Sequence, residues 1–199
     1  MILSPIIHPH VKEWLEQIRV SVDLIERAWA SEQPAQPADP PPPPAEKWLR
    51  WPSLAPDKKL TQAFGANPQN YARLGLPGHE GIDIRAPHAT PIIAAADGEV
   101  VRVDFYADDK AKQPYGHSVR IRHRRAEGEY GTIYAHLIDN SAKVKVGQWV
   151  TAGTVIGLAD STGNSSADHL HFGLKKLLVQ TGDPFRGYVD PLPFVIDPP

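Results

Sequence analysis

The sequence predicts a mostly β domain of the sandwich or barrel-sandwich kind, preceded by one amphipathic helix and a proline-rich linker. Three observations favour this fold class. Short β-type runs fill the larger C-terminal part of the 199-residue chain, an apolar stripe of helical period lies near its N-terminus, and a run of prolines separates the two. A chain of this length has room for one domain with appendages.

Composition and charge exclude several classes of protein. Cysteine is absent, so disulfides and thiolate metal ligands are excluded, and any zinc must be held by histidine and carboxylate. The formal net charge of -2 argues against a nucleic-acid binder that works by counterion release. No apolar run approaches the roughly 20 residues that cross a bilayer. The N-terminus has no cationic start, and Pro5 interrupts its apolar stretch, so a Sec signal peptide is not expected.

The first predicted element is an amphipathic helix from Pro9 to about Ala30, within an N-terminal segment over 1–32. Its apolar residues are spaced alternately four and three apart, as on one face of a helix: Val11, Leu15, Ile18, Val22, Ile25 and Trp29. This stripe would dock on the rest of the protein or pair with a second copy as a short coiled coil. Docking is slightly favoured, because three heptads are marginal for a dimer.

A proline-rich linker over 33–47 separates the helix from a domain over 48–199. Its run from Pro40 to Pro44 favours an extended polyproline II spacer, with recognition by a proline-binding partner as the alternative. Directly after the linker, Trp48 and Trp51 are expected to pack their indoles on the domain.

Beyond Gly65 the pattern is that of short strands separated by turn residues. The strand-like runs are Thr90–Ala94, Gly98–Val103, His117–His123, Gly131–His136, Trp149–Val150 and Val155–Leu158. The segments Pro91–Val101 and Val144–Gly157 look alike and resemble biotinyl or lipoyl carrier domains. Such carriers display a modifiable lysine at a hairpin tip, and the Asp97-Gly98 turn has none, so a carrier function is not expected.

The stretch Asp168–Leu174 carries two histidines that flank one apolar residue. Because side chains alternate along a strand, His169 and His171 point to one face while Leu170 and Phe172 point into a core. Two imidazoles on one sheet face suit a metal ligand beside a catalytic base. The alternative is an ordinary strand with two solvent-facing histidines.

A second stretch pairs His79 with Asp83, and nearby glycines and a proline argue against a helix there. In a loop that runs into a strand, the two side chains converge while Ile82 and Ile84 anchor the core. Imidazole and carboxylate are suitable zinc ligands, and His171 would complete a set of three. Three protein ligands leave a fourth position for water, which is the catalytic arrangement.

A third stretch, Gly131–Leu137, reads as a strand that ends in a histidine. Alternation predicts that Ile133, Ala135 and Leu137 face the core, and that Tyr134 and His136 face the opposite side. His136 is an ordinary strand-end histidine or a second imidazole aimed at a metal-bound water. The polar turn over 160–167 leads into the His169 strand and would form one wall of a groove.

Together these motifs resemble, in order and with comparable gaps, those of the lysostaphin-type (LytM-like) zinc metallopeptidases. The motifs are His79-x-x-x-Asp83, Tyr134-Ala135-His136-Leu137, Ser161-Thr162-Gly163-Asn164-Ser165 and His169-Leu170-His171-Phe172. The resemblance covers roughly Leu60 to Pro193. It implies a β-rich groove fold of the duplicated hybrid motif type, and cleavage of peptide cross-links in bacterial peptidoglycan.

Carried over to these positions, the resemblance implies that Zn²⁺ is bound by His79, Asp83 and His171. His169 would be the general base, and His136 would position the water or stabilise the oxyanion. Some members place a tyrosine upstream of the first ligand. Tyr71 is the nearest candidate here and lies outside the predicted set.

The expected function is a zinc-dependent endopeptidase acting on peptide stems or cross-bridges of peptidoglycan, at the cell wall, in the extracellular or periplasmic space. The missing export signal points to release by lysis, delivery by a phage particle or another route. The alternative function is a catalytically inactive wall-binding or regulatory module on the same fold.

Four arginines (Arg120, Arg122, Arg124 and Arg125) are read as solvated surface, with contact to an anionic wall polymer as the alternative. His117 and His123 are expected to be structural or surface residues.

Overall fold

The computed structural model divides the chain into two compact units, Met1–Pro43 and Pro44–Pro199, each of which is described by itself. The structure describes residues 9–32, 46–104 and 114–199. Most of the predicted proline-rich linker and the first eight residues therefore lie outside the described part of the chain.

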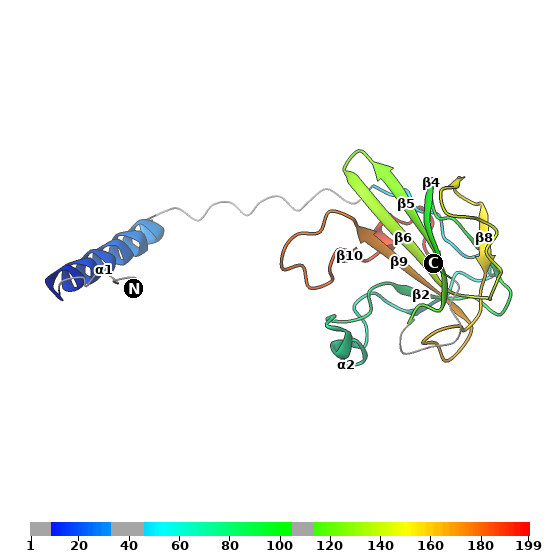
Figure 1. The fold of residues 1–199 in the computed structure, drawn as a ribbon, viewed down its shortest axis with the longest axis horizontal. Coiled ribbons are helices and arrows are strands. Elements are labelled where there is room, and N and C mark those ends of the chain that lie inside the picture. Colours follow the sequence, from blue (N-terminus) through cyan, green and yellow to red (C-terminus); the bar gives the residue numbers. More distant parts are fainter. Residues whose placement is uncertain (1–8, 33–45, 105–113) are drawn as a thin grey trace, which may run out of the picture. The chain divides into compact units, whose positions relative to one another are not determined.

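The described element of the first unit is the helix α1 (Pro9–Glu32), drawn in blue in Figure 1, which confirms the predicted helix. The stripe residues Val11, Leu15, Ile18 and Val22 are all exposed, with 41–49% of each accessible. Among the described residues, no helix combines the length and apolar character needed to cross a membrane. Self-association through the stripe stays a prediction.

The second unit is built on one large antiparallel sheet (Figure 1). Its strands follow the order β1 (Leu60–Gln62), β2 (Ile82–Arg85), β9 (His169–Lys176), β6 (Gly128–Leu137), β5 (His117–Arg125), β4 (Gly98–Asp104) and β7 (Trp149–Val150), while β10 (Tyr188–Val189) also pairs with β9. A separate two-stranded sheet joins β3 (Pro91–Ile93) and β8 (Val155–Leu158). Short helical turns complete the unit: α2 (Pro68–Tyr71), η1 (Ala72–Leu74) and η2 (Leu192–Phe194).

The predicted mostly β fold is confirmed, and each of the six predicted runs contains an observed strand. The short strand β1 and the turn α2 were not predicted. Both are too short for a periodic hydrophobic pattern to develop, so neither leaves a clear signal in the sequence.

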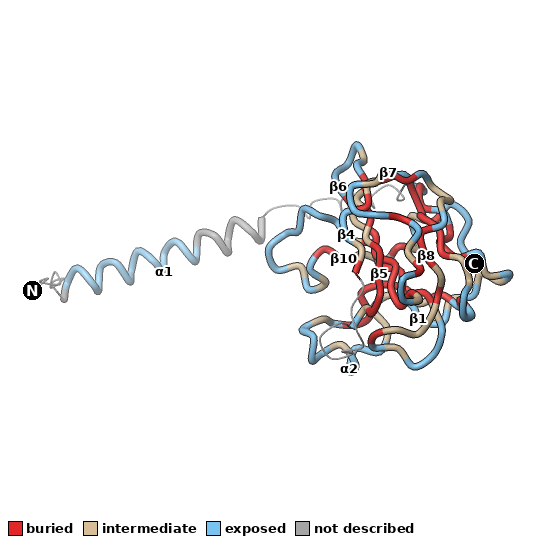
Figure 2. Tube along the Cα trace, turned by 45° about the vertical axis from the view of Figure 1, so that its right-hand side comes forward, coloured by how far each residue is buried: buried red, intermediate tan, exposed pale blue. Residues whose placement is uncertain are grey.

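One face of the large sheet packs on a hydrophobic core. Figure 2 draws all buried residues in red, polar ones included. Ile82 and Ile84 of β2 are fully buried in it, as are Leu170 and Phe172 of β9. The indoles of Trp48 and Trp51 are also buried, as the sequence predicted for the segment that leads into the domain. The other face of the sheet carries the polar groups described below.

The prediction for the faces of β6 was wrong for three residues. Tyr134 lies opposite the core residue Phe172 and is fully buried, whereas Ala135 lies opposite His171 on the other face. The Tyr134 hydroxyl accepts a hydrogen bond from the backbone N–H of Ala95 at 2.8 Å. Ile133 lies on the same polar face as Ala135. The core side of β6 is therefore occupied by Tyr134, whose hydroxyl is hydrogen-bonded, and not by the aliphatic residues on either side of it.

The alternation along β6 is interrupted at His136, whose backbone has a φ of +60°. On the neighbouring strand, Val119 pairs with Tyr134 and His117 pairs with Leu137, so β6 holds one extra residue in this interval. Such a β-bulge re-aims the side chains that follow it. It returns Leu137 to the core and brings His136 to the polar face, where the sequence predicted it.

Candidate metal centre

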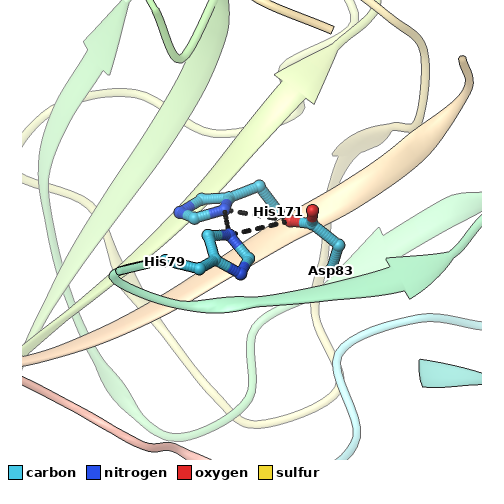
Figure 3. Close-up of side chains that lie close together, drawn as sticks. All are labelled: His79, Asp83 and His171. Carbon is cyan, nitrogen blue, oxygen red and sulfur yellow. Dashed lines mark hydrogen bonds and ion pairs between the residues drawn. The ribbon is translucent and has the colours of Figure 1, made fainter. Parts of the chain in front are cut away.

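Three ligand atoms converge at one end of the polar sheet face (Figure 3). His79 Nε2 lies 2.9 Å from His171 Nδ1 and 3.2 Å from Asp83 Oδ1, and the last two atoms are 3.1 Å apart. Ligands held at 2.0–2.1 Å by a tetrahedral zinc ion are separated by about 3.3 Å. The spacing and the chemistry of these three donors therefore fit one such ion.

Strand register accounts for the meeting of Asp83 and His171. The two residues are directly opposed in the antiparallel pair β2–β9, which sets opposed side chains about 5 Å apart at Cβ. Their neighbours Ile82 and Phe172 are likewise opposed and face the core. Burial of the apolar set thus fixes which polar side chains share the other face.

His79 comes from the segment before β2, and its orientation is set by a backbone contact. Its Nδ1–H donates to the carbonyl of Ala63 at 3.2 Å, which leaves the Nε2 lone pair facing the other two ligands. The side chain is almost fully buried, so this tautomer is protected from water.

Gly81 leaves room for the ring of His171. A Cβ at position 81 would lie 2.8 Å from His171 Cε1 and 2.7 Å from the carbonyl oxygen of Phe172. Neither distance is compatible with a side chain. The glycine between the two predicted ligands of this loop is therefore a packing requirement of the third ligand.

The charge of the site is set by Asp83. Burial opposes ionisation of its carboxyl, but the close contacts with the imidazoles of His171 and His79 outweigh burial and hold its pKa well below the usual range. The carboxylate is therefore ionised at neutral pH. One anionic oxygen and two imidazole nitrogens form a donor set that suits a divalent cation.

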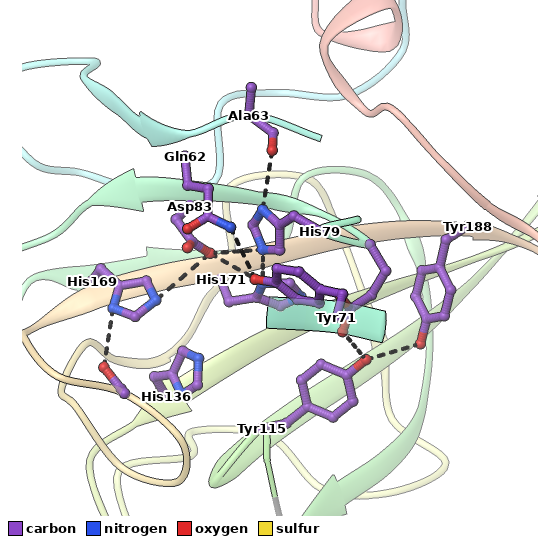
Figure 4. A network of polar contacts seen from close by, with 12 residues as sticks. Gln62, Ala63, Tyr71, His79, Asp83, Tyr115, His136, His169, His171 and Tyr188 are labelled. Carbon is purple, nitrogen blue, oxygen red and sulfur yellow. Dashed lines mark hydrogen bonds and ion pairs between the residues drawn. The ribbon is translucent and has the colours of Figure 1, made fainter. Parts of the chain in front are cut away.

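Two further imidazoles lie beside this cluster (Figure 4). His169 donates its Nδ1–H to the carbonyl of Ala167 at 2.8 Å, and its Nε2 lies 3.6 Å from Asp83 Oδ1. His136 donates its Nδ1–H to the carbonyl of Thr162 at 2.6 Å. The two rings lie 4.6 Å apart between centroids. In both residues the backbone contact fixes the tautomer in which Nε2 is an acceptor.

The environment keeps His136 neutral. Burial, together with the nearby His169 and His171, lowers the pKa of its imidazole to about 3, against the opposing effect of the Thr162 carbonyl. A neutral His136 whose Nδ1–H is already bonded accepts hydrogen bonds at Nε2 and donates none. It can hold a water molecule but is not suited to donate to an oxyanion.

The structure thus brings all five predicted residues to one cavity of about 530 Å³. Tyr71 also lines this cavity, although it was left outside the predicted set. Its ring lies 5.4 Å from that of His79, and its hydroxyl accepts a hydrogen bond from Gln62 at 2.9 Å. Burial, with a smaller effect from the charge of Asp83, raises the pKa of Tyr71 to about 12. The tyrosine is therefore a protonated donor at the cavity wall.

A second tyrosine network, which had no sequence signal, lies at the edge of this cavity. The Tyr115 hydroxyl donates to the buried Glu80 at 2.7 Å and lies 3.3 Å from the hydroxyl of Tyr188. These three residues are far apart in sequence and meet only through strand pairing. The ring of Tyr115 lies 5.5 Å from that of His171, so the network adjoins the ligand cluster.

Comparison with known proteins gives one family match and many relatives. The model of Peptidase family M23 matches residues 77–186. An uncharacterized metalloprotease of Haemophilus influenzae is 35% identical over 125 residues, which is 63% of this chain and 24% of the relative. The DD-carboxypeptidase/endopeptidase Mpg of Neisseria meningitidis is 43% identical over 132 residues, or 58% of this chain and 28% of the relative. Lysostaphin of Staphylococcus staphylolyticus is 36% identical over 101 residues, which is 50% of this chain and 19% of the relative.

Solved structures give the same picture. The catalytic domain of lysostaphin from Staphylococcus simulans matches with a TM-score of 0.52 and 28% identity, over 69% of this chain and 91% of the domain. A zinc-containing peptidase from Vibrio cholerae matches with a TM-score of 0.55 and 27% identity, over 77% of this chain and 41% of that structure. The chain spans 28% or less of the length of the three relatives named above.

Proposed function

Because the chain belongs to Peptidase family M23, we propose that it is a zinc-dependent endopeptidase that hydrolyses peptide stems or cross-bridges of bacterial peptidoglycan. The observation that carries this proposal is the convergence of His79, Asp83 and His171, with two acceptor imidazoles beside them in one cavity. Relatives named as endopeptidases support a peptide substrate. Their names apply to those proteins, and for this chain the substrate is part of the proposal.

In the proposed reaction the three ligands hold Zn²⁺, which when bound polarises a carbonyl and lowers the pKa of a coordinated water to about 7. The anionic carboxylate of Asp83 and the two imidazoles would supply three ligands and leave room for a water molecule as the fourth. All three residues line the cavity, where the substrate would enter.

His169 is the proposed general base. Its Nε2 carries the lone pair, because the Nδ1–H is bonded to the carbonyl of Ala167. A neutral imidazole with a free Nε2 lone pair can accept a proton from the attacking water and return it to the leaving amine. The contact with Ala167 also disperses the positive charge that the ring gains.

His136 is the proposed water-positioning residue. The same tautomer argument makes its Nε2 an acceptor, and its lowered pKa keeps it neutral while His169 cycles. Of the two roles that the resemblance implies, positioning the water fits this side chain and stabilising an oxyanion does not. The bulge at this position aims the ring into the cavity.

Tyr71 is proposed as the donor to the developing oxyanion. Its hydroxyl accepts from Gln62, so its own proton is free to point into the cavity. A raised pKa of about 12 keeps that proton in place at neutral pH. In this proposal Tyr71 donates to the oxyanion, while His136 and His169 accept.

The proposed place of action is the cell wall, in the extracellular or periplasmic space. The test is digestion of purified peptidoglycan by the full chain, after removal of metal with a chelator and after return of zinc. Release of soluble peptides that stops with the chelator and resumes with zinc would support the proposal. A zinc-loaded chain that binds peptidoglycan and releases no peptide would refute it in favour of the inactive wall-binding module.

A further inference from the structure

The polar face of the large sheet continues beyond the metal centre into a second cavity, here called the basic cleft. It has a volume of about 490 Å³, and four cationic side chains line it: Arg102, Arg120, Arg122 and Lys175. Three apolar side chains with 41–43% exposure form its rim: Val101, Leu177 and Val179. A cleft with these components suits an anionic ligand that also has apolar parts.

Strand register places the basic cleft and the metal centre on the same face. Along β9, His169, His171, Gly173 and Lys175 alternate with the core residues, so all four lie on the polar face. Lys175 lies four residues beyond His171, or about 13 Å at the rise of a strand. An extended peptide whose scissile bond lies at the ion therefore reaches Lys175 three or four residues further along.

The other cations reach this face through pairing across three strands. Gly173 is opposed to Ile133 of β6, Ile133 is opposed to Arg120 of β5, and Arg120 is opposed to Arg102 of β4. Lys175 is opposed to Gly131, which has no side chain, and Gly131 is opposed to Arg122. Gly131 therefore places no side chain between Lys175 and Arg122, and the tip of Leu177 packs beside it.

Two of the four cations already have carboxylate partners. Arg122 contacts Glu99 at 2.6 Å and Arg102 contacts Asp104 at 2.6 Å. Arg120 and Lys175 have no carboxylate within 4.0 Å in the described ranges of the chain. Arg120 lies over the ring of Tyr115 at 5.5 Å, and Lys175 lies over that of Tyr188 at 5.0 Å. These ring contacts hold the two cations in place without neutralising them.

The same two tyrosines separate the basic cleft from the metal cavity. Their hydroxyls lie 3.3 Å apart, and Tyr115 lines the metal cavity while Tyr188 lines the basic cleft. Arg120 and Lys175 thus contact the two tyrosine rings that lie between the basic cleft and the metal cavity. In addition, the Nε atom of Arg120 is buried and makes no hydrogen bond within the described residues.

We propose that the basic cleft is a specificity subsite that binds a carboxylate of the substrate peptide, with Arg120 and Lys175 as the pairing cations. This inference rests on the proposed function and names the chemistry that the site selects beside the scissile bond. A carboxylate accepts two hydrogen bonds from a guanidinium and one from an ammonium, both of which gain strength from the charges. The apolar rim contacts the neighbouring aliphatic side chains of the peptide.

The test is binding of a fluorescein-labelled peptidoglycan stem peptide to the zinc-loaded full chain, measured by anisotropy at low salt. The peptide is used in two forms, with its carboxylates free and with them amidated. The free form is expected to bind at least tenfold more tightly, and raising the salt concentration is expected to reduce the difference. Equal binding of the two forms would overturn the proposal.

Variants locate the effect, with Lys176→Ala as a matched control on the opposite face of β9. Arg120→Ala and Lys175→Ala are each expected to weaken binding of the free form about tenfold, and to leave the amidated form unchanged. An equal effect of Lys175→Ala and Lys176→Ala would refute the subsite. Displacement of the peptide by millimolar inorganic phosphate, with no displacement by acetate, would assign the cleft to phosphate and likewise overturn the proposal.

The binding assay separates the failure of this inference from failure of the proposed function. Selective binding by a chain that never cleaves peptidoglycan would refute the endopeptidase and retain the carboxylate subsite. Cleavage of peptidoglycan with no discrimination between the two peptides would refute the subsite alone.

Discussion

Asp83 and His171 face each other across two adjacent antiparallel strands, with Oδ1 and Nδ1 3.1 Å apart. The hydrogen-bond ladder of β2 and β9 sets this spacing, and His79 is added from the segment just before β2. Two of the three candidate ligands are thus positioned by paired strands. The site is therefore expected to be preformed.

Loss of a ligand and loss of the base are expected to have different signatures. His171→Ala removes a donor atom of the ion, so both bound zinc and peptidoglycan digestion should be lost. His169→Ala should retain zinc and lose activity by about 10²–10⁴-fold, because only proton transfer is affected. Bound zinc is measured by mass spectrometry, and activity is measured by dye release from labelled peptidoglycan. His10→Ala, on the exposed helix, is the control. Digestion at the parent rate by His169→Ala would exclude it as the base.

Gly81→Ala is expected to damage the centre without touching a ligand. The added Cβ overlaps the ring of His171 and the Phe172 carbonyl, and overpacking of this kind costs about 1–3 kcal/mol. Zinc affinity and unfolding by urea should both decrease. Gly131→Ala is the matched control on β6, because its Cβ would meet the flexible tip of Leu177 at 3.3 Å and the Ile121 carbonyl oxygen at an ordinary 3.9 Å. Equal zinc affinities in the two variants would contradict this account of Gly81.

Removal of metal is expected to lower the melting temperature and leave the sheet intact. Zinc at a hundred times its dissociation constant stabilises the folded state by about 2.7 kcal/mol, which corresponds to about 5–10 °C for a chain of this size. Far-ultraviolet circular dichroism with and without chelator should be the same at 25 °C. His171→Ala should show no shift on addition of zinc. Loss of the β signal in the chelated parent would show that the site is not preformed.

The stability of the domain is expected to fall as the pH falls below about 6.5, in part through His123. Burial lowers the pKa of this imidazole, against the opposing effect of its hydrogen bond to the Asp97 carbonyl. The unfolded chain binds the proton more readily, so each pH unit between the unfolded and folded pKa values costs about 1.4 kcal/mol. The contribution of neutral His123 to the free energy of unfolding is therefore complete only above about pH 6.5, the pKa of histidine in the unfolded chain.

Urea unfolding of the metal-free chain at pH 7.5 and 5.5 measures this contribution. His136 titrates in the same direction, so His123→Gln is compared with the parent to isolate one residue. The variant should be less stable than the parent at pH 7.5, because glutamine replaces the bonds to Asp97 and Thr132 imperfectly. It should lose less stability than the parent on acidification. An equal loss in both proteins would remove His123 from the explanation.

Self-association through α1 is expected to depend on concentration. The exposed stripe from Val11 to Val22 would be buried between two copies as a short coiled coil. Light scattering should then give a mass that rises with concentration for the full chain, and a constant monomer mass after deletion of residues up to Ala30. A monomer at all concentrations for the full chain would exclude this pairing.

Residues close together in the sequence could be assigned to a face with few errors. His169 and His171 share a face because side chains alternate along a strand, and the buried neighbours Leu170 and Phe172 identify which face is polar. The same rule failed on β6. There Tyr134 faces the core, with its hydroxyl hydrogen-bonded to the backbone N–H of Ala95. The apolar pattern had instead placed Ile133 and Ala135 in the core, so the alternation was predicted with the two faces exchanged.

The sequence by itself determined the residue types of the candidate ligand set, the alternation of β9 and the exclusion of thiolate chemistry, because these depend on residue type and on steric rules that act over a few residues. Tertiary structure decided the rest. The pairing of β2 with β9, the bulge that turns His136 into the cavity, and the assembly of the basic cleft from four strands all depend on contacts between distant segments. Their register is chosen by the burial of the whole apolar face, and no local pattern encodes that choice.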